Sequence, residues 1–283
     1  MIVQSTARVD PQSTAPLSYR RALHALSRDG VPFLVGGSAA IAAYCGIEKR
    51  SKDLDVFVEA YNVNRALSAL ALAGFRTETP FPHWLAKAHT GEHFIDVIFN
   101  SGNGTAPVDL EWFAHAPPAL VLGIPVLMCP AEETLWSKAF VMERERFDGA
   151  DVAHLLLSYA RQMDWGRLLR RFAEHWPVLF AHLILFGYAF PSEADRVPGW
   201  VMDELRAKVH ARPAPANGLC RGTLLSREQY LWDLARGWKD ARLPPTGCMS
   251  KEEITIWTEA IRAAHDDHDY VGPTSAQHRN PVE

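Results

Sequence analysis

Short apolar runs bounded by turn residues recur through the first 130 positions of the chain and predict strands there. In each run, apolar residues of high β-propensity are followed by Gly, Pro, Asn or Asp, which is typical of strands joined by tight turns. The expected strands are residues 33–35, 54–58 and 92–100, a pair around the turn at 123–125, and weaker candidates at 75–81 and 83–89. We expect a loop at 101–109, because it is rich in Gly and contains Pro.

Apolar residues at intervals of three and four positions predict helices. In the first half this spacing appears at 18–30, 39–44 and 62–75, and two of these segments end at a glycine, Gly30 and Gly74. From Pro130 the helical spacing dominates. The expected helices are 131–147, 150–162, 166–176, 177–186, 197–209 and 226–238.

This order of elements predicts an α/β (α+β) fold, in which a mixed sheet flanked by helices is followed by an α-helical C-terminal domain. We place a flexible leader at 1–16, a catalytic domain at 17–130, a helical domain that completes the cleft at 131–266, and a flexible tail at 267–283. The most hydrophobic stretch, 168–190, contains His175 and His182 and is too broken for a membrane span, so it is interpreted as a buried helix.

The composition indicates a globular protein but does not identify a binding partner. The chain has 283 residues, 48% of them hydrophobic and 22% charged, which is typical of a globular protein with a real core. A formal net charge of −4 gives no global signal for nucleic-acid binding, although a local patch remains compatible with it. Four dispersed cysteines and an N-terminus without a signal-peptide pattern predict a cytoplasmic protein with reduced thiols and no membrane association.

The segment 33–59, FLVGGSAAIAAYCGIEKRSKDLDVFVE, holds the main candidate chemistry. Gly36 and Gly37 allow a tight turn, and Ser38 begins a helix whose free N–H groups form an anion site. Asp53 and Asp55 project from the same face of a strand, where two carboxylates favour a bound cation such as Mg²⁺. A phosphate cradle followed by such a pair indicates phosphoryl or nucleotidyl transfer.

A third carboxylate lies in an apolar run. Asp96 is surrounded by Ile95 and Val97, where an isolated charge is costly, so it should be paired, protonated or metal-bound. Asp109 and Glu111 are rival candidates, but they follow a Gly-rich loop instead of lying in an apolar strand.

These motifs resemble the DNA polymerase β-type nucleotidyltransferase superfamily, whose signature is a hydrophobic-Gly-Gly/Ser turn, a helix and then Asp-x-Asp/Glu. The resemblance covers roughly residues 30–160, with a connector slightly longer than in many members. It implies a third carboxylate on a neighbouring strand, which Asp96 matches. Asp53, Asp55 and Asp96 are then the catalytic, metal-binding residues, with two Mg²⁺ ions, and Gly36, Gly37 and Ser38 bind the nucleotide.

Within the superfamily, the motifs look most like the bacterial AbiEii-type toxin group. That resemblance implies a helical lysine and a later aspartate that complete the nucleotide site, matched here by Lys138 and Asp151. Without it, Lys138 is a solvent-facing lysine and Asp151 stabilises a helix dipole. Lys52, in the basic connector 49–52, is a further phosphate-binding candidate with a solvated loop as its alternative.

Other residues keep a structural interpretation beside a functional one. Lys87 and His89 precede Asp96 and could face the cleft, but an interpretation without a role in the site is favoured. Three tryptophans are candidates for stacking on a base and are otherwise core residues: Trp84, Trp112 and Trp136.

The resemblance implies a Mg²⁺-dependent enzyme that moves an NMP from ATP or another NTP to an acceptor hydroxyl and releases pyrophosphate. The acceptor is left open between tRNA, a protein and a small molecule, and a toxin role would bring an antitoxin partner. The alternatives are an antibiotic nucleotidyltransferase and a nucleotide-binding regulatory or toxin–antitoxin module without turnover.

Overall fold

Five strands form the central mixed sheet in the computed structural model of the chain, which describes residues 3–4, 15–47, 53–211 and 218–269. Their order across the sheet is β2-β3-β6-β5-β4. The bounds are β2 (Leu34–Val35), β3 (Asp53–Phe57), β4 (Arg76–Phe81), β5 (Leu85–Thr90) and β6 (His93–Ile98). β3 and β6 run parallel, and the other neighbours are antiparallel.

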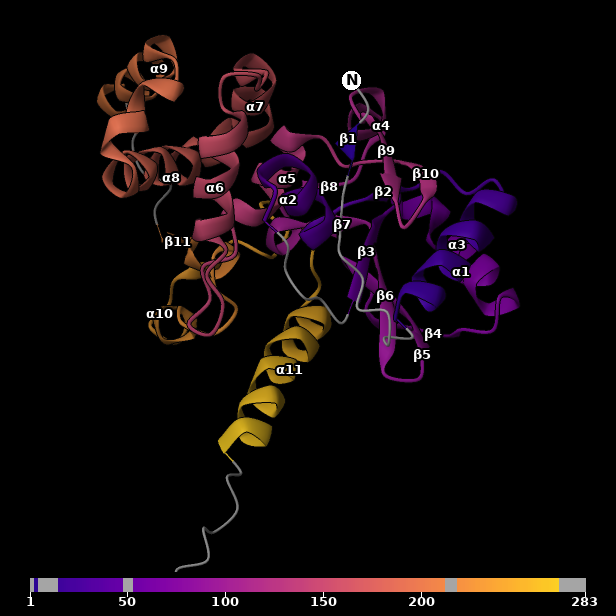
Figure 1. Ribbon diagram of the computed structural model, residues 1–283. Coiled ribbons are helices and arrows are strands. Elements are labelled where there is room, and N and C mark those ends of the chain that lie inside the picture. Colours follow the sequence, from indigo (N-terminus) through magenta and orange to yellow (C-terminus); the bar gives the residue numbers. More distant parts are fainter. Residues whose placement is uncertain (1–2, 5–14, 48–52, 212–217, 270–283) are drawn as a thin grey trace, which may run out of the picture.

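The alternation of side chains divides the sheet into a packed face and a face that carries the acidic residues. Leu54 and Val56 of β3 and Val97 of β6 are buried together with α1 (Ala15–Arg28) and α3 (Val63–Leu72). The residues between them point to the opposite face, because successive side chains of a strand alternate. That face lies toward α2 (Gly37–Cys45) and the helices after residue 130 (Figure 1).

The weaker strand candidates are both strands of this sheet. β4 pairs with β5 along the edge, with a register shift between Glu78 and Phe81. Pro80 lies inside that shift, where an edge strand tolerates the missing N–H donor.

The predicted hairpin around Gly123 is present but lies outside the central sheet. β9 (Pro118–Val121) pairs with β10 (Ile124–Leu127) on one side and with β1 (Val3–Gln4) on the other, in a separate three-stranded sheet. The two sheets meet beside the glycine turn, where the Cys129 N–H donates to the Val35 carbonyl at 2.8 Å.

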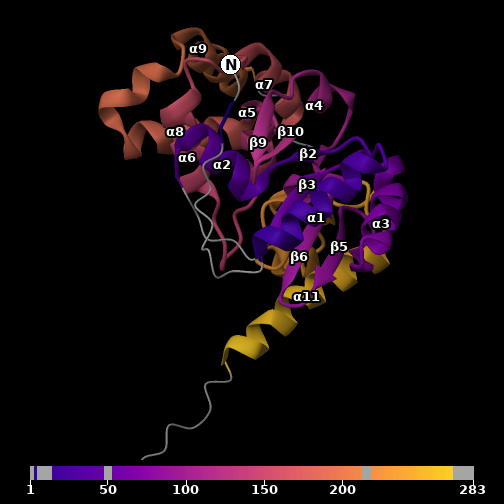
Figure 2. The same cartoon turned by 45° about the vertical axis from the view of Figure 1, so that its right-hand side comes forward.

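The part after residue 130 is built from helices, with small elements between them. The larger helices are α5 (Ala131–Ala139), α6 (Gly149–Tyr159), α7 (Trp165–Phe172), α8 (Trp176–Ala189), α9 (Gly199–His210) and α11 (Lys251–Asp269). The smaller elements between these helices are β11 (Leu219–Cys220), α10 (Leu231–Ala235) and β12 (Lys239–Asp240). Three further small elements precede residue 130, namely β7 (Asn100–Ser101), β8 (Ala106–Pro107) and α4 (Leu110–Ala114). The first turn of α11 lies near the sheet, and the helix projects away from the body of the molecule (Figures 1 and 2).

The helix predicted over 131–147 is wrong in its second half. α5 ends at Ala139, and the Phe140 carbonyl accepts a hydrogen bond from the Asn103 side chain at 3.1 Å. The chain then forms a tight reversal, in which Met142 and Phe147 make an isolated β-bridge and the Glu143 N–H donates to the Arg146 carbonyl at 2.9 Å.

The prediction that the hydrophobic helix α8 is buried holds for one face only. Leu179, Leu183 and Phe186 are buried, whereas Ile184 is 53% and Tyr188 is 85% exposed. Within the described part of the chain, no helix has the length and apolar character that crossing a bilayer requires.

The helices share a hydrophobic core with the sheet. Phe57 and Ile98 of the central strands pack in one cluster with residues of α5 to α9, including Leu135 and Phe172. The fold is therefore the predicted mixed sheet flanked by helices with a helical C-terminal part. The division at residue 130 remains a prediction, and most of the predicted leader and tail lies outside the described residues.

Candidate active site

Three carboxylates meet on the two central parallel strands. Asp55 of β3 is in register with Asp96 of β6, and Asp53 lies two positions before Asp55 on the same face. Carboxylate oxygens of all three residues lie within 4.8 Å of one another. Parallel pairing in this register is therefore what brings Asp96, distant in sequence, to the Asp53–Asp55 pair.

Burial and mutual repulsion disfavour the charged forms of these carboxylates. Burial, together with the charges of Asp53 and Asp96, raises the pKa of Asp55 to about 7, although Lys138 and Arg146 act in the opposite direction. Burial also raises the pKa of Asp96, and Lys87 opposes that rise. A cation at the triad would relieve both the repulsion and the loss of hydration.

The two glycines of the turn allow the backbone to lie directly against the acidic strand. A Cβ at Gly37, whose φ is +56°, would lie 1.6 Å from Asp55 Oδ2. A Cβ at Gly36 would lie 2.4 Å from the Phe57 ring and 2.8 Å from Cys129 Sγ. Only glycine fits at either position, and the close approach brings the start of α2, with Ser38, to the triad.

Two cations and two carboxylates form the wall opposite the triad. Lys138 Nζ of α5 lies 3.0 Å from Asp148 Oδ2 and 2.8 Å from Asp151 Oδ2, and its side chain is only 11% exposed. Arg146 binds Asp148 through Nε and Nη2, both at 2.9 Å, while its side chain is 67% exposed. The carboxylates thus hold both cations in place beside the cavity.

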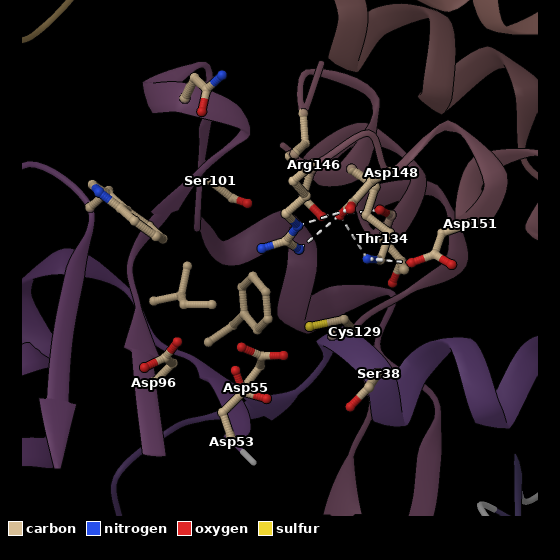
Figure 3. A pocket seen from close by; sticks show the side chains of 18 of the residues that line it. Ser38, Asp53, Asp55, Asp96, Ser101, Cys129, Thr134, Arg146, Asp148 and Asp151 are labelled. Carbon is tan, nitrogen blue, oxygen red and sulfur yellow. Dashed lines mark hydrogen bonds and ion pairs between the residues drawn. The ribbon is translucent and has the colours of Figure 1, made fainter. Parts of the chain in front are cut away.

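A cavity of about 480 Å³ separates the triad from this wall. Figure 3 shows Asp53, Asp55 and Asp96 on one side and Arg146 and Asp148 on the other. The remaining lining combines small polar groups near the start of α2 with aromatic groups at the other end. It includes Ser38, Thr134, Ser137, Phe57, Ile98, Trp84, Arg227 and Trp257.

The cavity brings together most of the site residues predicted from the sequence. Gly37, Ser38 and the three aspartates line it, and so do Lys138 and Asp151. Lys138 is nearly buried and ion-paired, so it is not a solvent-facing lysine. Lys52 and the basic connector 49–52 lie outside the described residues.

The rival carboxylates have other roles. Asp109 caps α4 by accepting the Glu111 N–H at 3.0 Å, and it forms an ion pair with Arg171 at 2.6 Å. Glu111 also lies 3.2 Å from Arg171. Trp112 and Trp136 are buried, as expected for core residues, although Trp112 also lines the cavity. Trp84 is half-buried and lines the cavity as well.

Lys87 contacts the triad, so the favoured interpretation that gave it no role in the site is wrong. Lys87 lies opposite Asp96 in the antiparallel β5–β6 pair, and its Nζ lies 2.7 Å from Asp96 Oδ1. The sequence held a signal for this contact in the alternation along β5, which puts Lys87 on one face of the strand. The pairing of β5 with β6 then places Lys87 opposite Asp96. Arg146 and Asp148 were also missed, because the chain reversal after α5 was interpreted as helix.

Solved structures with a similar arrangement include three nucleotidyltransferases of low sequence identity. ANT(2″)-Ia in complex with adenylyl-2″-tobramycin is 14% identical, with a TM-score of 0.37, over 70% of this chain and 99% of that one. Lincomycin-bound LnuA, a lincosamide antibiotic adenylyltransferase, is also 14% identical, with a TM-score of 0.37, over 50% and 96%. A putative nucleotidyltransferase from H. pylori is 12% identical, with a TM-score of 0.38, over 73% and 100%.

We draw no functional conclusion from these three structures, since every TM-score lies below 0.5. A comparison with curated proteins found no match. A family model described as "uncharacterised nucleotidyltransferase" matches residues 12–186, which include the glycine turn, the triad and the opposite wall. The chain therefore belongs to this family of nucleotidyltransferases.

Proposed function

We propose that the protein is a Mg²⁺-dependent nucleotidyltransferase that moves an NMP from an NTP to an acceptor hydroxyl and releases pyrophosphate. The observation that carries the proposal is the carboxylate triad, which faces an anion-binding helix start and a cationic wall across one cavity. Family membership supports the transfer of a nucleotide, and the donor set supports the metal.

The residues present fit a divalent cation. Three carboxylates supply the hard oxygen ligands that Mg²⁺ prefers. A bound cation would offset the burial and the carboxylate repulsion that raise the pKa of Asp55 to about 7. Two Mg²⁺ ions held by Asp53, Asp55 and Asp96 would polarise the transferred phosphoryl group, activate the attacking hydroxyl and neutralise the leaving pyrophosphate.

The chain's own groups act on the β- and γ-phosphates, which leave together as pyrophosphate. N–H groups at the start of α2, with the Ser38 hydroxyl, bind the β- and γ-phosphate oxygens. Lys138 and Arg146 supply positive charge for the leaving pyrophosphate. Asp151 and Asp148 position Lys138, and Asp148 also positions Arg146.

Asp96 serves the attacking side of the reaction. Its carboxylate orients the acceptor hydroxyl and can accept the proton of that hydroxyl. Lys87 fixes one carboxylate oxygen at 2.7 Å and leaves the other free for the site.

The experiment that tests this proposal separates binding from transfer with one isosteric change. Asp96→Asn should leave the affinity for Mg²⁺–NTP within a few-fold, measured by calorimetry, and lower the transfer rate by about two orders of magnitude. Asp109→Asn is the matched control, because Asp109 pairs with Arg171. A variant at position 96 with normal transfer would contradict the proposal.

The acceptor, the nucleotide and the biological role rest on the sequence resemblance alone. From the AbiEii-type resemblance, the first class to test is a toxin that modifies tRNA or protein and has an antitoxin partner. An antibiotic or another small molecule is the second class of acceptor to test. A silent nucleotide-binding module would bind Mg²⁺–NTP saturably and transfer nothing.

A further inference from the structure

The reversal after α5, residues 140–148, carries Arg146 to the cavity with little packing around its side chain. The side chain is 67% exposed, and its guanidinium binds Asp148 through Nε and Nη2, both at 2.9 Å. Figure 3 shows this guanidinium on the side of the cavity that faces Asp55. An arginine this exposed keeps much rotamer freedom, so the place of the guanidinium depends on where the backbone of the reversal lies.

Glu143 connects the backbone at Arg146 to a segment that lies eighty residues later in the chain. Its N–H donates to the Arg146 carbonyl at 2.9 Å, which closes the reversal. Its carboxylate, only 5% exposed, accepts hydrogen bonds from Ser226 Oγ at 2.8 Å, the Arg227 N–H at 3.1 Å and Arg227 Nε at 2.9 Å. All three donors belong to the segment 222–227, so one buried carboxylate anchors the reversal to that segment.

Two further contacts join the same two parts of the chain. The Met142 N–H donates to the Leu225 carbonyl at 3.1 Å. The Asn103 side chain donates to the Phe140 carbonyl at 3.1 Å and to the Leu224 carbonyl at 2.8 Å, so it bridges the start of the reversal and the distant segment. These bonds fix the start of the reversal, and Glu143 fixes its tip.

The anchoring segment is itself firmly buried. Thr223 and Ser226 have no exposed surface, and in Figure 1 the chain between α5 and α6 passes beside the segment between β11 and α10. Hydrogen bonds to a buried carboxylate are strong, so the anchor resists displacement. The segment lies outside residues 12–186, which the family model matches. A part of the chain beyond the family match therefore determines where the reversal lies.

We propose that Glu143 is a positioning residue, which anchors the reversal to the segment 222–227 and so holds Arg146 where its guanidinium meets the β- and γ-phosphates. This deepens the proposed function and rests on it. A cation that is already in place loses less conformational entropy when the triphosphate binds, so the anchor increases affinity without touching the ligand. The carboxylate of Glu143 is compensated by Arg227 at 2.9 Å, which limits its repulsion of the phosphates.

The test measures binding of inorganic tripolyphosphate to the full-length protein by calorimetry, with and without Mg²⁺. This probe presents a triphosphate without a base, so the result does not depend on which NTP the enzyme uses. Arg146→Met should lower the affinity for Mg²⁺–tripolyphosphate about tenfold, because a charged contact to the phosphates is lost. Glu143→Gln should lower it about fivefold, because the arginine remains but is no longer held in place.

A double-mutant cycle shows whether Glu143 acts through Arg146. With Arg146→Met already present, adding Glu143→Gln should change the affinity by less than about twofold, because the group that it positions is gone. With Lys138→Met present instead, Glu143→Gln should keep its loss of about fivefold. Ser226→Ala removes a single donor to Glu143 and should give the same pattern with a smaller loss.

A buried carboxylate elsewhere on α5 provides the control for general destabilisation. Glu133 is fully buried and binds Arg167 and Arg171 of α7. Glu133→Gln should lower the melting temperature of the protein, yet leave the affinity for Mg²⁺–tripolyphosphate within about twofold of the wild type. A loss of affinity that follows stability alone would appear in this variant as well.

The outcomes separate this inference from the proposed function. If the wild type shows no Mg²⁺-dependent binding of tripolyphosphate, the proposed function fails and this inference fails with it. If the wild type binds and either Glu143→Gln or Arg146→Met binds equally well, only the positioning role is overturned. An equal loss from Glu143→Gln with and without Arg146 would also overturn it, because Glu143 would then act on the fold as a whole. If Glu143→Gln does not fold, the cycle of Ser226→Ala with Arg146→Met decides, and additive losses there count against the inference.

Discussion

Replacing Asp55 with asparagine should stabilise the metal-free protein at pH 8. The folded structure raises the pKa of this carboxyl from 3.8 to about 7, chiefly through burial and then through Asp53 and Asp96. Because the folded pKa lies above the unfolded one, the free energy of unfolding falls as pH rises from about 4 through 7. The full difference corresponds to roughly 4 kcal/mol, which Asp55→Asn would recover.

Thermal unfolding of wild type and variant at pH 5 and pH 8, with and without millimolar Mg²⁺, measures this effect. Without metal, the variant should unfold roughly 5–10 °C above the wild type at pH 8, with a smaller gap at pH 5. Mg²⁺ should raise the melting temperature of the wild type at pH 8, because the ion binds only the folded triad. It should raise that of Asp55→Asn much less.

The control is an exposed aspartate on a helix. Asp203 is 73% exposed at its side chain, so Asp203→Asn should change the free energy of unfolding by less than about 0.5 kcal/mol. A variant at position 55 that is less stable than wild type at pH 8, or that gains as much from Mg²⁺, would refute the reasoning.

Three further changes test other parts of the site. Lys138→Met should weaken Mg²⁺–NTP binding tenfold or more by calorimetry, with Lys138→Arg recovering only part, because a planar guanidinium does not replace a compact ammonium; unchanged affinity in both variants would remove Lys138 from the nucleotide site. Gly37→Ala should abolish Mg²⁺-dependent stabilisation, since the new Cβ would lie 1.6 Å from Asp55 Oδ2. The control Gly46→Ala, at a glycine with φ +68° and no atom within 4 Å of the new Cβ, should cost only backbone strain of roughly 1–2 kcal/mol. Equal effects of the two variants would contradict the close-approach argument. In the wild type, the buried ring of His83 has a pKa of about 4 and stays neutral at pH values where the unfolded chain already binds a proton. His83→Phe should therefore reduce the loss of unfolding free energy between pH 6.5 and 4 by up to about 3 kcal/mol, measured by urea titration. An unchanged pH profile would contradict this reasoning.

The part of the site that the sequence predicts well is local. The glycine turn, the start of α2 and the Asp53–Asp55 pair lie within 20 residues, and their spacing alone implies a shared face. The position of Asp96 beside the pair could not be derived from local spacing, because only the parallel register of β3 and β6 brings it to Asp55. Its apolar surroundings indicated a partner but not which one.

The parts that could not be predicted depend on contacts between distant segments. Helix α5 stops at Ala139 because the Asn103 side chain satisfies the Phe140 carbonyl, and nothing in the local sequence announces that hydrogen bond. Glu143 is likewise held by Ser226 at 2.8 Å and by Arg227, more than eighty residues later. The aromatic end of the cavity follows from these contacts, so periodicity gives no signal for it.

The measurement that tests the central claim most directly is the fate of the α-phosphate. The purified protein is incubated with Mg²⁺ and NTP labelled at either the α- or the γ-phosphate, together with fractionated RNA, protein and small molecules. Transfer of an NMP predicts that the α-label becomes attached to an acceptor while the γ-label leaves in pyrophosphate, and that Asp96→Asn loses this transfer. Attachment of the γ-label, or saturable NTP binding without attachment of either label, would contradict it.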